Sequence, residues 1–244
     1  MSEMMNGLSE LPHEVRKLAG ENWAFRWNVE RDAHLRFARM SGRLTRFGSP
    51  EGVVALARKA ADDEVRHTQL CATLAERYGA PVDPSKPASI HEVSPSRLAE
   101  PESLTYEIIA ACCVTETESA GVLTTLLASE PDPLVRETLH AIARDEVDHS
   151  RLGWAHLAHA RTVQKLDFMS ELLPVILGGT VDDSLFQPAK DPALESPLLV
   201  RAGILPHTQK REVFVRMLRE VVFPGLESNG IDPSFGKAWL DARA

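Results

Sequence analysis

Hydrophobic residues recur at intervals of three and four over long stretches of this chain, which is the pattern of amphipathic α-helices. The first stretch covers about residues 12–47 and places Trp23, Trp27, Phe37 and Leu44 on one face. Clusters of β-branched residues are few, while alanine, leucine, glutamate and arginine are abundant. The pattern therefore predicts a protein built of helices.

Three further helices are predicted, over about residues 50–78, 101–129 and 133–161. Short segments with glycine or proline separate the first helix from the second and the third from the fourth, and a short link makes neighbouring helices antiparallel. Between the second and third helices, five prolines in residues 80–101 break any helix and predict an extended crossover. A crossover of this length can span a bundle and set the second and third helices parallel.

The predicted fold class is all-α. Residues 1–165 are expected to form an antiparallel four-helix bundle of the ferritin-like connection pattern, with a short N-terminal arm and a long crossover between helices 2 and 3. Residues 166–244 are patterned more weakly, with helices at about 167–177 and 208–223. We predict a C-terminal helical extension that packs on the bundle and either caps a pocket or forms a homodimer interface.

Net charge, hydrophobic run length and cysteine content argue against several classes of protein. The chain carries 27 Lys and Arg against 35 Asp and Glu, a net charge of −8, which argues against a nucleic-acid-binding surface. No apolar run approaches the roughly 18–20 residues of a membrane span, and the N-terminus lacks the apolar core of a signal peptide. Cys71, Cys112 and Cys113 are odd in number, and two are adjacent, so no disulfide framework is indicated. We expect a soluble, cytoplasmic protein that binds neither nucleic acid nor membrane.

A short internal repeat carries the candidate chemistry. The second helix contains Ala-Asp-Asp-Glu-Val-Arg-His, and the fourth contains Ala-Arg-Asp-Glu-Val-Asp-His. The repeated glutamate and histidine are Glu64 and His67 in the first motif, and Glu146 and His149 in the second. Residues three apart share a helix face, so each pair can reach a single metal ion.

Each motif needs a carboxylate from another helix, and the hydrophobic faces suggest which one. Glu30 lies on the face of the first helix that carries the tryptophans, where an unpaired charge is costly. In the third helix, Glu116 and Glu118 compete, and two residues apart they point to nearly opposite sides. Glu116 shares its face with hydrophobic residues while Glu118 lies among threonines, so we take Glu116 as the inward carboxylate.

The resulting set is the ligand inventory of a carboxylate-bridged dimetal site. Four carboxylates supply four negative charges, which match two divalent cations. Oxygen-rich ligation with one nitrogen per metal suits iron or manganese better than zinc. The predicted ligands are Glu30, Glu64, His67, Glu116, Glu146 and His149.

These residues and the helix connections resemble the ferritin-like di-iron carboxylate superfamily over about residues 15–162. A single Glu-x-x-His is a weak signal, but two in near-identical contexts, each preceded by an inward glutamate, are a strong one. The motifs are most similar to those of the oxygen-activating monooxygenases and desaturases, and also similar to those of rubrerythrin and bacterioferritin. The resemblance implies two metal ions, with Glu64 and Glu146 bridging them.

The residues next to the glutamates indicate which members of the superfamily the chain resembles most. Asp63 and Asp145 directly precede the ligands, as in the oxygen-activating members, where this aspartate accepts a hydrogen bond from the histidine of the opposite motif. The resemblance therefore implies the pairs Asp63–His149 and Asp145–His67. Arg66 also matches the monooxygenase pattern, whereas the second motif has an aspartate at the corresponding position.

Three other side chains are candidates for the surroundings of the metals. His34 lies one turn from Glu30, and we favour a supporting or core role for it over a role as a seventh ligand. Cys71 and Cys113 are expected to line the pocket as small buried residues.

The resemblance implies a di-iron oxidase or oxygenase. We expect it to activate O₂ and to hydroxylate, N-oxidise or desaturate a small organic substrate, with electrons from an external donor and an iron–manganese pair as the alternative to two irons. A rubrerythrin-like or bacterioferritin-like ferroxidase, acting in peroxide scavenging or iron handling, is the alternative function. The chain lacks the Cys-x-x-Cys pairs of rubrerythrin. A non-catalytic binding partner that keeps the bundle is a third hypothesis.

Overall fold

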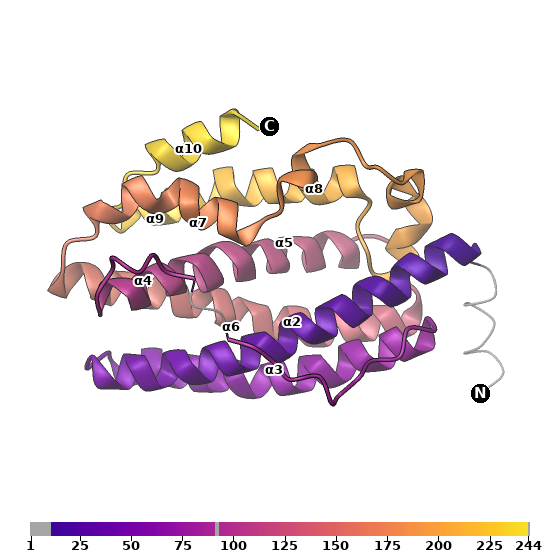
Figure 1. Cartoon of the computed structure of the whole chain (residues 1–244), viewed down its shortest axis with the longest axis horizontal. Coiled ribbons are helices and arrows are strands. Elements are labelled where there is room, and N and C mark those ends of the chain that lie inside the picture. The colour runs from indigo at the N-terminus through magenta and orange to yellow at the C-terminus, as the bar shows by residue number, and fades with distance from the viewer. Residues whose placement is uncertain (1–10, 91–92, 244) are drawn as a thin grey trace.

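The computed structural model describes residues 11–90 and 93–243, and within these ranges it contains helices and no β-strand. The prediction of an all-helical protein is therefore confirmed. Four long rods form the body of the molecule, and the third consists of three helical segments in succession (Figure 1). The rods are α2 (His13–Arg46), α3 (Glu51–Arg77), α4 (Glu102–Ile108) with η1 (Ile109–Thr115) and α5 (Glu116–Leu127), and α6 (Pro133–Val163).

α2 and α3 form an antiparallel pair because the chain reverses tightly between them. Gly48 ends α2 with a positive φ of 68°, a conformation that glycine adopts without steric cost. The N–H of Ser49 then donates to the carbonyl of Leu44, and Pro50 caps the start of α3. The tight reversal brings the hydrophobic face of α2, which includes the fully buried Phe37, against α3.

The third rod runs parallel to α3, as the crossover prediction requires (Figure 1). After α3, the chain returns along the bundle as an extended segment before α4 begins. Asp32 of α2 holds this segment, since its carboxylate accepts a hydrogen bond from the N–H of Ser89 at 2.7 Å. A short link then leads into α6, which runs antiparallel to the third rod and packs against both α5 and α3.

A π-helix interrupts the third rod directly before Glu116. The sequence pattern predicts one uninterrupted helix here, but residues 109–115 form η1, in which the Thr115 hydroxyl donates to the carbonyl of Ala110 at 3.0 Å. π-helical turns are rare and often occur at functional sites. The wider turn changes the direction in which the side chains after it point, and Glu116 is the first of these.

The C-terminal segment covers the side of the bundle formed by the third rod and α6 (Figure 1). α7 packs on η1, and α8 packs on α5. Ile176 and Phe214 of this segment share a hydrophobic cluster with Ile109 and Leu157 of the rods. Its helices are η2 (Asp167–Leu172), α7 (Leu173–Thr180), η3 (Asp183–Phe186), η4 (Pro192–Glu195), η5 (Pro197–Ala202), α8 (His207–Met217), η6 (Leu218–Val222), α9 (Phe223–Ser228) and α10 (Ser234–Asp241).

One expectation for this segment needs correction. The helix predicted over 167–177 begins as a 3₁₀ turn and continues through the Gly178–Gly179 pair to Thr180, because neither glycine has a positive φ that would end it. The short 3₁₀ helices and α10 carry too few residues to give a periodic pattern, so the sequence does not predict them.

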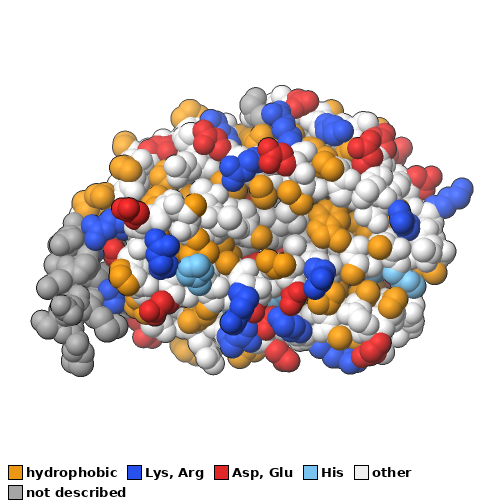
Figure 2. Space-filling model, turned by 180° about the vertical axis from the view of Figure 1, so that it is seen from behind, with side chains coloured by type: hydrophobic (Ala, Val, Ile, Leu, Met, Phe, Trp, Pro, Cys, Tyr) orange, Lys and Arg blue, Asp and Glu red, His pale blue; other side chains and the backbone are white. Residues whose placement is uncertain are grey.

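The outer surface is charged and mixed in sign. Acidic, basic and hydrophobic side chains are interspersed over the face that Figure 2 shows. Among the helices in the described ranges, none has an apolar stretch long enough to cross a bilayer.

Candidate metal centre

Six side chains that the sequence predicts as metal ligands meet inside the bundle. They come from α2, α3, α5 and α6, and none of them is more than 7% exposed. Acidic residues are rarely buried without a partner, so such a collection of carboxylates at one place calls for an explanation. The six are Glu30, Glu64, His67, Glu116, Glu146 and His149.

Five of the six form two groups that share one carboxylate. Glu30, Glu64 and His67 make the first group, and Glu64, Glu116 and His149 make the second. Within each group, one ligand atom of each residue lies within 4.8 Å of the others. Each group could hold a metal ion, and Glu64 would then lie between the two ions.

The sixth residue, Glu146, faces the same centre. Its Oε2 atom lies 3.4 Å from Nδ1 of His149, and its Oε1 accepts a hydrogen bond from the Ser119 hydroxyl at 3.3 Å. Neither Oε2 of Glu146 nor Nδ1 of His149 has a hydrogen-bond partner, although both are buried. Unpaired buried polar atoms are costly. A cation bound between them would satisfy both atoms, so these residues fit a metal ion.

The two histidines lie opposite each other because their motifs are on the antiparallel helices α3 and α6. Their ring centroids are 5.6 Å apart. In each motif, the histidine follows its glutamate by three residues, so both side chains point to the same side of the helix. His67 Nδ1 accordingly lies 3.0 Å from Glu64 Oε2. The repeat in the sequence thus becomes a pair of facing Glu–His units.

Each histidine contacts the aspartate of the other motif. His67 Nε2 lies 3.3 Å from Asp145 Oδ2, and His149 Nε2 lies 3.3 Å from Asp63 Oδ2. Both contacts that the resemblance implies are thus present. When Nε2 carries the proton and donates to the aspartate, Nδ1 is left with a lone pair directed at the carboxylate centre. The aspartates therefore orient the imidazoles so that Nδ1 faces the carboxylates and could bind a metal ion.

Two basic side chains, Arg66 and Lys59, cover these aspartates at the protein surface. Arg66 donates to Asp63 at 2.9 Å and to Asp145 at 2.6 Å, while Lys59 Nζ lies 2.7 Å from Asp63 and 3.3 Å from Asp148. Burial opposes ionisation of Asp63, but the hydrogen bonds from Lys59 and Arg66 outweigh it and lower the pKa of this carboxyl. Asp63 is thereby held as an anionic acceptor for His149. Asp148, which departs from the monooxygenase pattern, pairs with Lys59 instead.

Glu30 is a buried carboxylate that tends to hold a proton when the protein groups alone are considered. Burial and the charge of Glu64 raise its pKa to about 8, although Arg26, 3.5 Å away, acts in the opposite direction. The thiol of Cys71 donates to Glu30 at 3.7 Å and so lies beside this ligand candidate. A divalent cation would take over the charge compensation that the proton supplies.

The pKa values of Glu116, Glu146 and His149 are also shifted, and in different directions. Burial and the charge of Glu146 raise the pKa of Glu116. Burial also opposes the charges of Glu146 and His149, but their mutual contact lowers the pKa of Glu146 to about 2 and raises that of His149 to about 12. Protons must therefore offset much of the buried negative charge. Two divalent cations would neutralise the four carboxylates fully.

The remaining candidates lie outside the two groups. The His34 ring contacts the Ala61 carbonyl at 2.8 Å, which is a structural hydrogen bond between α2 and α3. Cys113 packs against Gly153 of α6, and its burial raises the pKa of its thiol. Glu118 is half-buried and takes no part in either group, in contrast to Glu116.

Several residues of the centre were not found from the sequence. Arg26 precedes Glu30 by four residues and Lys59 precedes Asp63 by four, so a search for oppositely charged residues at this spacing would have found both. Ser119 gave no signal, because a hydroxyl three residues after a glutamate is common.

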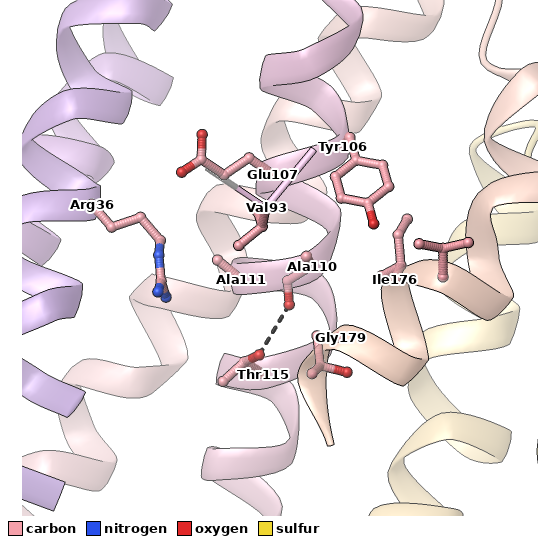
Figure 3. Close-up of a pocket in the computed structure, with 11 residues that line it drawn as sticks. Arg36, Val93, Tyr106, Glu107, Ala110, Ala111, Thr115, Ile176 and Gly179 are labelled. Atoms are coloured by element: carbon pink, nitrogen blue, oxygen red, sulfur yellow. Dashed lines mark hydrogen bonds between the residues drawn. The ribbon is translucent and has the colours of Figure 1, made fainter. Parts of the chain in front are cut away.

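A pocket of about 340 Å³ lies between α2, η1 and α7 (Figure 3). Arg36 lines it from α2, Ala111 and Thr115 line it from η1, and Ile176 lines it from α7. Glu116, a ligand candidate, directly follows Thr115 in the chain. None of the three pocket candidates from the sequence, His34, Cys71 and Cys113, lines this pocket.

No protein family, curated protein or solved structure matched this chain when they were compared with it. The described residues establish a helical protein with buried carboxylate–histidine groups that could hold metal ions.

Proposed function

We propose that this chain is a ferritin-like di-iron oxidoreductase that activates O₂ to oxidise a small organic molecule. The single observation that carries the proposal is the sharing of Glu64 by two buried ligand groups. A carboxylate shared in this way is the arrangement that a bridged pair of metal ions requires. A single structural metal would need only one of the two groups.

The donor atoms support iron. Each group offers two carboxylates and one imidazole, a combination that suits iron or manganese, and no cysteine belongs to either group. Two irons are the proposed cofactor, with an iron–manganese pair as the alternative that metal analysis would identify. When bound, the metals would supply the redox chemistry with O₂, and an external electron donor would return them to the reduced state.

The protein groups would bind, orient and shield the metals. Asp63 and Asp145 would hold the two imidazoles in one tautomer, as their contacts with Nε2 indicate. The fully buried ring of Phe37 packs on His149, with 5.3 Å between ring centroids, and keeps water from this side of the centre. Arg26 would balance Glu30 whenever that carboxylate is ionised.

The pocket beside η1 favours oxidation of an organic molecule over iron handling. A volume of about 340 Å³ lies in the range of small-molecule sites, and part of its wall comes from hydrophobic side chains. A ferroxidase that passes iron into a mineral store has no need of such a pocket.

The proposal is tested by loading the purified chain with ferrous ion in the absence of oxygen and counting the bound metal. We expect two iron ions per chain, and consumption of O₂ when the loaded protein is mixed with oxygenated buffer. Accumulation of many ferric ions per chain would instead indicate iron storage. Failure of the chain to bind two ions under any of these conditions would overturn the proposal.

A matched pair of variants controls this measurement. Glu64→Ala removes the shared carboxylate, and Glu118→Ala removes a glutamate on α5 that lies outside both groups. Loss of iron in the first variant and retention in the second would attribute the binding to the centre. Equal binding by both would place the iron elsewhere.

A further inference from the structure

The pocket between α2, η1 and α7 has a charge that no side chain of residues 11–90 and 93–243 neutralises. Arg36 reaches toward it from α2, is half-buried, and forms no ion pair or hydrogen bond within the described part of the chain (Figure 3). The acidic residue in the wall, Glu107, is already engaged, since it forms ion pairs with both Arg39 and Arg43. The side of the pocket near Arg36 therefore carries a net positive charge.

A second polar group in the wall is also without a partner. Tyr106 is 2% exposed and lines the pocket, yet its hydroxyl forms no hydrogen bond with any of the residues that the structure places. Figure 3 shows the ring on the side of the pocket where Ile176 lies. The hydroxyl can donate to, or accept from, a bound molecule.

Most of the remaining wall is hydrophobic, with Thr115 and Thr180 as its other polar side chains. Val93, Ala110, Ala111, Val175 and Ile176 line the pocket. Small side chains in η1 leave the space open, while α7 closes the opposite side. A molecule that fits must therefore combine an apolar body with one anionic group.

Two residues of the pocket wall directly precede residues at the metal centre in the chain. Arg36 precedes Phe37, which packs on His149, and Thr115 precedes Glu116. Cys112 is influenced by a residue of each site: burial and the charge of Glu116 raise the pKa of its thiol, whereas the charge of Arg36 lowers it. Both charges thus act on one fully buried side chain.

We propose that this pocket binds an organic carboxylate, with the carboxylate on Arg36 and the apolar part along Ala110, Ala111 and Ile176. A planar guanidinium pairs with a carboxylate through two parallel hydrogen bonds, which an amide of the same shape cannot reproduce. The identification of this carboxylate as the molecule to be oxidised rests on the proposed function. Its binding to the pocket is independent of the proposed function.

The test is calorimetric titration of the whole chain with two carboxylates, 3-phenylpropanoate and octanoate, and with the neutral amide of each. We expect the better carboxylate to bind at least about tenfold more tightly than its amide. Arg36→Gln should remove this preference and leave amide binding unchanged, and Arg36→Lys should restore part of it. Arg36 forms no ion pair or hydrogen bond within the described ranges, so its replacement removes no such contact there. Arg46→Gln, at the end of the same helix and outside this pocket, should bind like the wild type.

Titration of both the iron-loaded and the iron-free chain separates this inference from the proposed function. Carboxylate binding that depends on Arg36 in both forms supports the pocket, even if the chain shows no reaction with O₂. Binding that needs iron and ignores Arg36→Gln would mean that the carboxylate ligates the metal, which overturns the inference while leaving the proposed function intact. Binding of neither carboxylate, or equal binding of acid and amide, would also overturn the inference.

Discussion

Across the interface of α3 and α6, His67 Nε2 lies 3.3 Å from Asp145 Oδ2. The equivalent contact in the opposite direction joins His149 Nε2 to Asp63 Oδ2 at the same distance. Each helix thus orients the histidine of the other. An aspartate that fixes a ligating imidazole typically contributes about 10–100-fold to metal affinity.

Replacement of Asp145 by alanine is therefore expected to weaken iron binding by about one to two orders of magnitude, because the His67 ring loses its acceptor. The measurement is a ferrous titration with a competing chelator. Asp148→Ala, three residues further along α6 and paired with Lys59 at the surface, serves as the control and should change the affinity little. Equal losses in the two variants would mean that net charge, not orientation of the imidazole, controls binding.

The sharing of Glu64 predicts unequal effects of the glutamates on metal stoichiometry. Glu30 belongs to one ligand group and Glu116 to the other, so Glu30→Ala and Glu116→Ala should each retain one ion. Glu64→Ala should lose the two-ion site altogether. Metal analysis of the purified variants by mass spectrometry checks these numbers. Two irons in Glu64→Ala would show that the ligand assignment is wrong.

The long helices and the six candidate ligands could be predicted from the sequence because their signals are local. Glu64 and His67 share a helix face by their spacing alone, and the hydrophobic neighbours of Glu30 and Glu116 mark these residues as inward. The same reasoning separated Glu116 from Glu118. Periodicity within one helix was sufficient in each case.

The π-helix and the pocket could not be predicted in this way. The extra residue of η1 depends on how the third rod packs on α6 and α7, and a sequence of small hydrophobic residues fits an α-helix equally well. The pocket joins Arg36, Thr115 and Ile176, which are far apart in the chain and meet only in the folded protein. No local pattern relates them.

The close approach of α6 to η1 predicts a steric effect at Gly153. A Cβ atom added there would lie 2.6 Å from Cys113 Sγ and 3.1 Å from the Cys113 backbone nitrogen. Gly153→Ala should therefore lower the free energy of unfolding by about 1–3 kcal/mol, as overpacking does. Gly42→Ala, in α2 with nothing within 4 Å, should raise it by up to about 1 kcal/mol through helix propensity. Urea denaturation of both variants checks the opposite signs, and a stabilised Gly153→Ala would contradict the close approach.

The buried His156 predicts a dependence of stability on pH that does not involve the metal centre. Burial, with a small contribution from His159, lowers its pKa to about 4, and its Nε2 contacts the Thr105 hydroxyl at 3.1 Å. Unfolding returns the pKa to about 6.5, so the unfolded chain binds the proton first as the pH falls. The contribution of the neutral imidazole is fully present above pH 6.5 and is lost progressively between pH 6.5 and 4. At pH 4.5 the loss should amount to about 2–3 kcal/mol.

Comparison with His156→Gln isolates this effect, because glutamine can keep a hydrogen bond to Thr105 but cannot take up a proton in this range. Unfolding free energies of the two proteins, measured by urea denaturation from pH 7 to 4.5, should converge or cross as the pH falls, since only the wild type loses the contribution. All other histidines and carboxylates are common to both proteins and cancel in the difference. Parallel curves over this range would mean that His156 is already protonated in the folded protein or exposed to water, in contradiction to its 4% exposure.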